Sequence, residues 1–440
     1  MHKAQLSLPL SKLGINANQF SANAVYVTRQ LLDAGYEAYI VGGAIRDLML
    51  GLAPKDFDVA TNATPEQVKR VFRRARIIGR RFKIVHVYQG RELIEVTTFR
   101  KAATQKTQKF QEVDTSGRLL SDNVYGTLQD DVVRRDFSVN AFYYDVEKEC
   151  VLDFCDGYSD IKNKTLRLLG DPLTRYQEDP VRMLRAVRFK AKLDFTYADD
   201  TQQPLTTHQH LLSSVPAARM LEECFKLFLK GHGLPCFLEM QKFGLFAELF
   251  PLTAKCLETN DYQCQQVIEQ AMGNTDYRVS IDKPVSPVFL FAVLLWAPIQ
   301  KIAEEYIQAN EPIITAWVQA SLEVFSAQQS NTSIPRRISV PSQTVVTMQP
   351  RFHLRKGRRV KWMLQQPRFR AAYDLMLLRQ SAGLVDQETA DWWTNIQTLN
   401  KDEQDQKIFN KPRHARSKVR QGKKRQRKRK SSKSRQSPKG

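Results

Sequence analysis

The spacing of apolar residues changes once along the chain, and this change limits the available folds. Up to about Lys164, short runs of β-branched and aromatic residues alternate with helical stretches, which indicates a domain of strands and helices. From Asp179 onward, apolar residues recur almost throughout with helical spacing. With 440 residues and 42% hydrophobic content, the chain can bury several cores. We therefore expect an α+β fold, with a mixed-sheet head followed by all-helical domains.

The same pattern predicts individual elements and boundaries. Expected strands cover residues 38–41, 56–60, 83–88, 93–99 and 141–145. Expected helices cover residues 180–192, 217–229, 236–243, 262–272, 287–296 and 311–327. We place an N-terminal extension at 1–24, the head at 25–165, a first helical domain at 166–235, a second at 236–400 and a tail at 401–440. A polar stretch at about 101–129 has little periodicity and predicts a mobile surface loop in the head.

Positive charge is concentrated at the C-terminus. Residues 411–440 contain 15 Lys or Arg and no Asp or Glu, so they supply most of the net charge of +21. A segment this polar and charged cannot offset the entropy cost of ordering, and we expect it to be disordered. Such a tail favours a polyanionic partner such as nucleic acid; a solubilising or localisation tail is the alternative.

The cysteines and apolar runs narrow the class of protein. The six cysteines form no CxxC pair, which indicates neither a zinc site nor a disulfide framework and suits a reducing, cytoplasmic setting. The longest apolar run, Val288 to Ala297, is too short to cross a bilayer and precedes Pro298, so we expect a buried helix and no transmembrane segment. The chain also lacks the GxxxxGK[ST], GxGxxG and HExxH motifs, and its seven histidines suggest no ligand set.

One stretch, "VGGAIRDLMLGLAPKDFDVAT" (residues 41–61), combines two features that suggest chemistry. Gly42 and Gly43 follow an expected strand and precede a short helix, so they form either a plain turn or a backbone site for an anion. Asp56 and Asp58 lie two apart in an expected strand, which places both carboxylates on one face and Phe57 on the other. Like charges on one strand face repel, and a divalent cation such as Mg²⁺ relieves that repulsion.

Three long motifs, in order, resemble those of the class II tRNA nucleotidyltransferases and bacterial poly(A) polymerases. They are "VGGAIRDLMLG…KDFDVAT", "DDVVRRDFSVNAFYYD" and "EDPVRMLRAVRF". The segments "DNVYGTLQDD" and "PRFRAAYDLMLLR", together with the basic tail, are similar to the bacterial poly(A) polymerase branch. The resemblance implies a five-stranded nucleotidyltransferase head, helical neck, body and tail domains, and template-free nucleotide addition to RNA 3′ ends.

The resemblance also assigns roles to residues. It implies that Asp56 and Asp58 bind two Mg²⁺ ions, with Glu95 as a supporting carboxylate or simply an exposed strand residue. It implies nucleotide contacts for Gly42, Gly43, Arg46, Asp47, Asp131, Arg134, Arg135, Asp136, Asn140, Asp179, Arg182, Arg185 and Arg188. Of Asp131 and Asp136, one can instead be a structural ion-pair partner. The residues matching Asp179 and Arg182 read the incoming base in that family; from spacing alone they would be a helix cap and ion pair.

A later basic and aromatic segment predicts an RNA-binding surface. Arg351, Arg355, Arg358, Arg359, Arg368 and Arg370 are interleaved with Phe352, Trp362 and Phe369. This mixture suits single-stranded RNA, by charge neutralisation and stacking, although the aromatics also suit a helical core. The expected function is therefore a poly(A) polymerase that adds AMP from ATP to RNA. The alternatives are a CCA-adding enzyme and an inactive RNA-binding protein that kept the fold.

Overall fold

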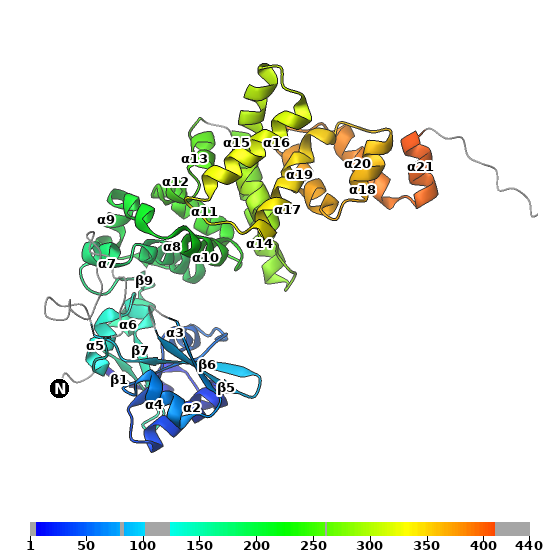
Figure 1. The fold of residues 1–440 in the computed structure, drawn as a ribbon. Coiled ribbons are helices and arrows are strands. Elements are labelled where there is room, and N and C mark those ends of the chain that lie inside the picture. Colours follow the sequence, from blue (N-terminus) through cyan, green and yellow to red (C-terminus); the bar gives the residue numbers. More distant parts are fainter. Residues whose placement is uncertain (1–5, 80–82, 102–123, 260–261, 410–440) are drawn as a thin grey trace, which may run out of the picture.

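A mixed sheet and a long series of helices divide the chain into two parts (Figure 1). The computed structural model describes residues 6–79, 83–101, 124–259 and 262–409. An α+β head followed by a helical remainder confirms the fold class expected from the change in apolar spacing. A small parallel pair, β9 (Thr165–Leu166) with β10 (Thr196–Tyr197), departs from it, because this part was expected to be all helical.

The head is built on one eight-stranded sheet in the order β1-β8-β7-β2-β3-β6-β5-β4. Its strands are β1 (Leu6–Pro9), β2 (Ala38–Val41), β3 (Asp58–Thr61), β4 (Ala75–Ile78), β5 (Ile84–Gln89), β6 (Glu92–Thr98), β7 (Phe142–Asp145) and β8 (Cys150–Asp153). In this sheet β3 and β6 pair in parallel, and the other neighbours are antiparallel. The five strands expected from the sequence are present as β2, β3, β5, β6 and β7.

The expectation of only five strands was wrong, because β1 and β8 lengthen the sheet at one end and β4 at the other. Strand β1 pairs with β8, so residues expected to form an extension before the head contribute its edge. Its sequence, LSLP, buries one side chain, Leu8, and so carries too short an alternating pattern to be recognised. Strand β4, ARII, is equally short and exposes Arg76 and Ile78.

Helices α2 (Ala22–Asp33) and α4 (Pro65–Val71) cover one face of the sheet. Helix α2 begins after Ser21, whose hydroxyl accepts the Ala24 N–H at 3.2 Å, and it buries Val27 and Leu31 one turn apart. Strand residues packed in the same core are Ile40, Val59, Val85, Val87 and Val96. This face is therefore apolar core, and charged groups of the alternating strands must lie on the opposite face.

Helix α5 (Leu128–Arg134) covers part of that opposite face. Its Leu128 and Val132 form a second core with Val41, Ala60 and Tyr143 of the central strands. Beyond α5, the face formed by β3, β6, β5 and β4 carries charged and exposed side chains. The remaining head elements are α1 (Leu10–Leu13), α3 (Gly43–Met49), α6 (Gly157–Lys162) and the 3₁₀ turns η1 (Ala17–Gln19) and η2 (Ser138–Asn140).

The helical remainder contains all six helices expected from the sequence. It comprises α7 (Pro172–Glu178), α8 (Val181–Leu193), α9 (Asp199–Thr207), α10 (Ala217–Phe228), α11 (Gly233–Lys242), α12 (Leu245–Leu249), α13 (Pro251–Glu258), α14 (Tyr262–Ser280), α15 (Pro287–Gln308), α16 (Ile313–Gln328), α17 (Arg336–Thr347), α18 (Arg358–Leu364), α19 (Phe369–Ser381), α20 (Gln387–Thr398) and α21 (Lys401–Phe409), with 3₁₀ turns η3 (Gln209–Ser214) and η4 (Gln349–Arg351). Helices α8 and α10 lie next to the head, and α18 to α21 lie farthest from it (Figure 1).

The apolar run from Val288 forms the buried helix that was expected, but α15 is longer than the run. It spans 22 residues and is long and apolar enough to cross a membrane by length and composition alone. The run from Val288 to Ala297 is therefore only part of a longer helix. Most of this helix is buried, and α16 and α17 pack against it. Cys150, Cys155, Cys224 and Cys236 carry free thiols.

Two expected irregular segments lie largely outside the residues that the structure describes. Residues 102–123 of the expected mobile loop are among them, and the loop ends earlier than expected, because Thr127 caps α5. The Thr127 hydroxyl accepts the Asp130 N–H at 3.3 Å. The expected tail also begins too early, since residues 401–409 form α21 and bury Ile408. Residues 410–440, where disorder was expected, are not described.

Candidate active site

A cleft of about 490 Å³ opens between the head and helices α8 and α10. It is lined by Gly42, Gly43, Arg46, Asp58, Arg134, Arg135, Asp136, Asn140, Asp179, Arg182, Arg185, Arg188, Phe189, Lys192 and Arg219. All the expected nucleotide-binding residues are in this lining except Asp47 and Asp131. Phe189, Lys192 and Arg219 were not among the expected site residues. Phe189 is the last residue of the "EDPVRMLRAVRF" motif, and Lys192 lies farther along the same helix. The three motifs, far apart in sequence, therefore meet around one cleft.

The two glycines bring the backbone close to cationic side chains. Gly42 has a φ of 79°, and a Cβ there would lie 3.4 Å from Nη1 of Arg135. A Cβ on Gly43 would lie 3.2 Å from Nη2 of Arg46. A larger residue would be strained by the positive φ at position 42 and would press on the Arg46 guanidinium at position 43. The pair therefore allows two arginine side chains to lie close to the backbone at the edge of the cleft.

The candidate catalytic carboxylates meet at the start of β3. Asp58 is the first residue of the strand, whereas Asp56 precedes it and is exposed, so the expected strand began two residues too early. Phe57 is buried at 8% exposure, as alternation requires. Asp58 faces Glu95 across the parallel β3–β6 pair. Burial, helped by Glu95 and Asp56 and opposed by Arg135, raises the pKa of Asp58 to about 6.

The donor set at this point fits Mg²⁺. No three His, Cys, Asp or Glu side chains within the described part of the chain converge closely enough to hold a metal ion by themselves. Glu95 instead lies 3.5 Å from Nε2 of His86, and its side chain is 46% exposed. Magnesium commonly uses one or two carboxylates and completes its coordination with substrate phosphates and water. Asp56 and Asp58 offer such a partial set, and a bound cation would relieve the unfavourable charge on Asp58.

Arg46 is fixed by neighbours before any ligand arrives. Its Nε donates to Oδ1 of Asp47 at 2.9 Å, and its Nη1 donates to the side chain of Asn140. Lys192 of α8 donates to the other carboxylate oxygen of Asp47 at 3.0 Å. Arg46 and Asp47 are both nearly fully buried. Asp47 thus lies behind the cleft and orients the cations that line it.

A second set surrounds Arg135. Its Nη2 lies 3.2 Å from Oδ2 of Asp131, and its Nε donates to the Tyr143 hydroxyl at 2.7 Å. The hydroxyl in turn donates to Asp131 at 2.8 Å. Burial alone would lower the pKa of Arg135, but Tyr143 and Asp131 together raise it above its usual range. Asp131 is therefore an ion-pair partner behind the cleft, and Arg135 stays charged within it.

Asp136 is also paired, although it lines the cleft. It accepts from the Arg185 guanidinium, from the Asn140 amide at 3.1 Å and from the Phe137 N–H at 2.8 Å. Burial would raise the pKa of Asp136, but these donors hold it well below its usual range. The sequence left open whether one of Asp131 and Asp136 is structural. In the structure both carboxylates bind an arginine.

Positive charge is crowded at Arg134 and Arg188, which lie close to other arginines. Burial and the nearby Arg100, Arg175 and Arg182 lower the pKa of Arg134 to about 9. Burial and Arg185 likewise lower the pKa of Arg188. The Nε of Arg188 is buried and has no hydrogen-bond partner within the described residues. Cations held close together in this way favour a polyanion in the cleft, because its charge would offset their mutual repulsion.

The expected pair of Asp179 and Arg182 is arranged differently from the prediction. Asp179 lies outside α8, in the extended turn after α7, and both its oxygens accept from Arg219 of α10 at 2.7 and 2.8 Å. Arg182 donates to Glu178 at 3.1 Å and to the Arg175 carbonyl at 2.6 Å. Pro180 precedes the first helical residue, so the helix begins one residue later than expected. Both groups still line the cleft.

The expected RNA-binding arginines lie far from this cleft, near α18 and α19. Arg358, Arg359, Arg368 and Arg370 are exposed, and Arg370 pairs with Asp374 at 2.9 Å. Arg355 is paired with Glu388, and Arg351 lies over the ring of Trp362 at 5.7 Å. Phe352 and Phe369 are buried, whereas Trp362 is 45% exposed. The aromatics thus divide between core and surface.

Comparisons with known proteins agree with this architecture. Family models match residues 38–167 as the "Poly A polymerase head domain", residues 194–257 as the "Probable RNA and SrmB- binding site of polymerase A" and residues 309–432 as the "Polymerase A arginine-rich C-terminus". Poly(A) polymerase I of Escherichia coli O6:H1 is 40% identical over 407 residues, which cover 89% of this chain and 85% of that protein.

Two further relatives extend the comparison. Poly(A) polymerase I of Haemophilus influenzae is 40% identical over 405 residues, covering 90% of this chain and 89% of its own length. The crystal structure of the Bacillus stearothermophilus CCA-adding enzyme in complex with CTP has the same fold, with a TM-score of 0.56 and 23% identity over 89% of this chain and 88% of that one. This chain therefore belongs to the bacterial poly(A) polymerase branch of the class II nucleotidyltransferase family, and it is a nucleotidyltransferase.

Proposed function

We propose that the chain adds AMP from ATP to the 3′ ends of single-stranded RNA without a template and releases pyrophosphate. The observation that supports this most is the meeting of Asp58 with a wall of arginines in one cleft. A carboxylate suited to a metal and cations suited to a triphosphate are what nucleotidyl transfer requires. The identity of about 40% with two poly(A) polymerases favours ATP as the substrate.

Asp56 and Asp58 would hold two Mg²⁺ ions together with oxygens of the triphosphate. The bound ions would supply neutralisation of the triphosphate charge and activation of the RNA 3′-hydroxyl. Arg135, fixed by Asp131 and Tyr143, presents its charge beside Asp58. Arg46 is held in the same way by Asp47 and Asn140. These arginines need little reorganisation when a triphosphate binds, which favours the reaction. Glu95 fits a supporting electrostatic role better than that of a ligand.

The base of the incoming nucleotide would meet the α7–α10 side of the cleft. Asp179 and Arg182 offer an acceptor and a donor there, and Arg219 and Glu178 hold them in place. Phe189 adds an aromatic surface on α8. We therefore assign catalysis to residues 25–165, base recognition to 166–235 and RNA binding to 236–400. The free thiols of Cys150, Cys155, Cys224 and Cys236 suit a reducing cytoplasm for this activity.

RNA would be held at a distance from the cleft by the arginines of α18 and α19. Arg358, Arg359 and Arg368 are exposed, and the exposed Trp362 beside Arg351 offers a stacking surface. The basic residues from 410 onward would add a further, salt-sensitive attraction. This arrangement suits an unstructured strand better than a folded duplex, because bases must be free to stack.

The test is to incubate the protein with Mg²⁺, an unstructured RNA and each nucleoside triphosphate separately. We expect long tails from ATP alone. A CCA-adding activity is the second candidate, since the neighbouring fold includes the CCA-adding enzyme bound to CTP. It would instead add C and A and stop on a tRNA that lacks its end. If no nucleotide is incorporated but RNA still binds, the chain is an RNA-binding protein only.

A further inference from the structure

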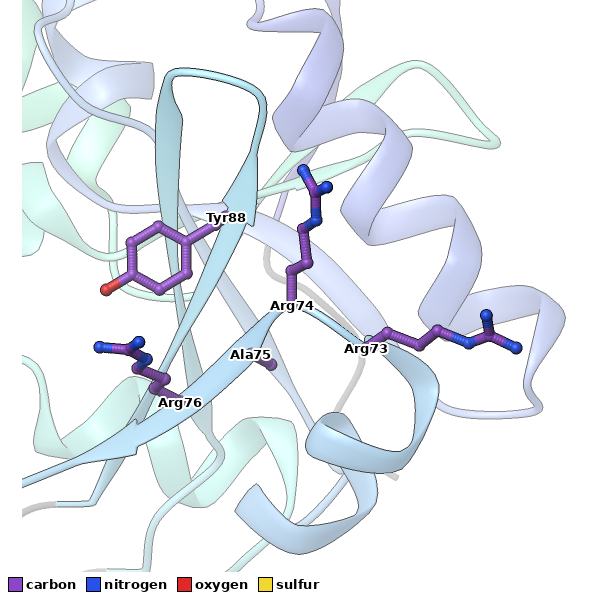
Figure 2. Close-up of a pocket in the computed structure, with 5 residues that line it drawn as sticks. All are labelled: Arg73, Arg74, Ala75, Arg76 and Tyr88. Atoms are coloured by element: carbon purple, nitrogen blue, oxygen red, sulfur yellow. The ribbon is translucent and has the colours of Figure 1, made fainter.

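A second pocket lies at the free edge of the head sheet, away from the cleft. It has a volume of about 400 Å³ and is lined by Arg73, Arg74, Ala75, Arg76 and Tyr88 (Figure 2). Arg76 of β4 lies 6.0 Å from the ring centroid of Tyr88 on β5. The three arginines are exposed, and within the described residues no carboxylate forms an ion pair with any of them. The Tyr88 ring is itself 37% exposed.

The strand register places this pocket on the same face as the catalytic carboxylate. Asp58 of β3 is opposite Glu95 of β6, Glu95 is opposite His86 of β5, and His86 is opposite Arg76 of β4. Side chains opposite one another in a sheet point to the same side. Three strand spacings separate Asp58 from Arg76, which is about 14 Å. The pocket is thus the outer end of a row that begins at the reaction centre.

Neighbouring residues extend this surface. Tyr88 is opposite Leu93 of β6, which is also 37% exposed, so the ring is continuous with an accessible apolar side chain. The Tyr88 N–H donates to the Arg74 carbonyl at 3.0 Å, which joins the backbone of Arg74 to that of Tyr88. Glu95 and His86 lie between the pocket and Asp58, and Oε1 of Glu95 is 3.5 Å from Nε2 of His86. A nucleic-acid strand lying along the row from Asp58 to Arg76 would therefore meet the Tyr88 ring and the neighbouring arginines at the outer end of that row.

This combination of groups indicates single-stranded RNA. Arginines without carboxylate partners neutralise phosphates, and an accessible aromatic ring stacks on bases of any sequence. An acidic peptide would satisfy the arginines but would not account for a position in line with the carboxylates of the cleft. An RNA whose 3′ end lies at Asp58 must continue in some direction, and the partly exposed side chains of Glu95 and His86 lead from Asp58 to this pocket.

We propose that Arg74, Arg76 and Tyr88 bind the single-stranded RNA substrate a few nucleotides upstream of its 3′ end. This inference rests on the proposed function, because it takes the 3′ end to lie at Asp58. The pocket then acts as a second contact for the strand, separate from the arginines of α18 and α19. It supplies a phosphate contact from each arginine and a stacking contact from the tyrosine.

Two measurements on the full-length protein test this without ATP. The first is the affinity for an unstructured oligoadenylate, by fluorescence anisotropy at several salt concentrations. Tyr88→Ala should weaken binding by about five-fold to about a hundred-fold, whereas Tyr88→Phe should retain affinity because it keeps the ring. The double variant Arg74→Ala with Arg76→Ala should lower the slope of log affinity against log salt by about 1.4, the expectation for two lost phosphate contacts.

The second measurement locates the contact. An RNA carrying 5-iodouridine at one position at a time is irradiated with the protein, and the crosslinked peptide is identified by mass spectrometry. We expect a crosslink to Tyr88 from an upstream position and none from the 3′-terminal nucleotide. The matched control is Lys12→Ala with Arg29→Ala, which removes two exposed cations from the head away from the pocket. This control should leave RNA affinity and salt slope unchanged.

The outcomes separate this inference from the proposed function. Loss of affinity on removing Tyr88, with an upstream crosslink, supports the pocket even if no nucleotide is incorporated. Normal RNA binding by both pocket variants, with no crosslink to Tyr88, overturns the inference and leaves the polymerase assay unaffected. Equal loss in the Lys12 and Arg29 control also overturns it, because the effect would then reflect overall charge. If the pocket variants keep full affinity for RNA but lose binding to an acidic peptide, the inference is overturned and the pocket is assigned to a protein partner.

Discussion

Arginines in the cleft and arginines on α18 and α19 have opposite surroundings. In the cleft, Arg135, Arg185 and Arg219 each bind a carboxylate, so their direction is fixed. On the distal helices, Arg358, Arg359 and Arg368 are exposed above an aromatic core. A fixed guanidinium suits one ligand geometry, whereas a free one can follow a flexible polymer. Arginine therefore serves two purposes in this molecule. Paired arginines hold a ligand in one position in the cleft, whereas exposed arginines on α18 and α19 can attract a flexible polymer in many positions.

The largest effect should come from the carboxylates that the cleft arginines face. The double substitution Asp56→Ala with Asp58→Ala should lower AMP incorporation by a factor on the order of a thousand, because the metal ions lose their protein ligands. Incorporation of labelled ATP into RNA measures this, and circular dichroism checks the fold. Asp33→Ala, an exposed carboxylate on α2, is the matched control. Activity close to the unsubstituted protein's would contradict the metal assignment.

The next test compares a paired carboxylate in each region. Asp136→Ala leaves Arg185 without its partner and should lower the free energy of unfolding by about 2 kcal/mol. Asp374→Ala, which removes the exposed partner of Arg370, should change it by less than about 0.5 kcal/mol. Denaturant unfolding with each variant gives both values. Similar losses in the free energy of unfolding for both variants would contradict the distinction between fixed cleft arginines and free distal arginines.

The stabilisation that the Asp136–Arg185 ion pair gives to the fold should depend on pH. The pKa of Asp136 is held below its usual range, so its ionised form stabilises the fold above the unfolded pKa of about 3.9. That contribution is lost as pH falls below this value. The difference in stability between the unsubstituted protein and Asp136→Ala should therefore shrink on acidification. A difference that grows toward low pH would show that Asp136 is not ionised in the fold.

A smaller effect is expected at Arg219, which fixes Asp179. Arg219→Ala should lower kcat/KM for ATP roughly tenfold, because a charged hydrogen bond is worth about 1.5 kcal/mol, and should reduce the preference for ATP over CTP. Steady-state kinetics with each nucleotide give the ratio. Arg219→Lys retains the charge but not the two-pronged contact, so it should recover only part of the loss. An unchanged ratio would remove Asp179 from base selection.

The smallest effect is expected on the distal helices. Arg358→Ala with Arg359→Ala should weaken RNA binding a few-fold at low salt and lower the salt slope by about 1.4, without changing the free energy of unfolding. Arg355→Ala is the control, because this arginine is already paired with Glu388. Binding titrations over a range of salt concentrations measure both. A loss of stability in the double variant would show that these arginines are structural after all.

Local features of the site could be predicted from the sequence. The glycine pair, the separation of Asp56 and Asp58, and the arginines of α8 lie within short motifs, and these motifs set backbone geometry over a few residues. The strands and helices with strong apolar spacing were also correct. These predictions succeed because alternation and helical periodicity are decided by neighbours in sequence.

Long-range partners could not be predicted. Arg219 binds Asp179 from 40 positions away, and Lys192 reaches Asp47 from 145 positions away. No spacing rule connects such residues, because the contact depends on how α10 and α8 pack on the head. The short edge strands β1 and β4 were missed for a related reason. A strand of four residues is selected by its partner strand more than by its own sequence.

Helix α15 has a consequence for the order of folding. Its first part, from Val288 to Ile299, is buried almost throughout, so this part has no polar face that would keep it in water while the chain is being made. The helices that pack against it, α16 and α17, follow directly in sequence, and the second of them ends at Thr347. At a synthesis rate of about 5–20 residues per second, they arrive within seconds. The sequential placement of these three helices therefore shortens the time during which a nascent chain presents a segment that membranes and other unfinished chains would bind.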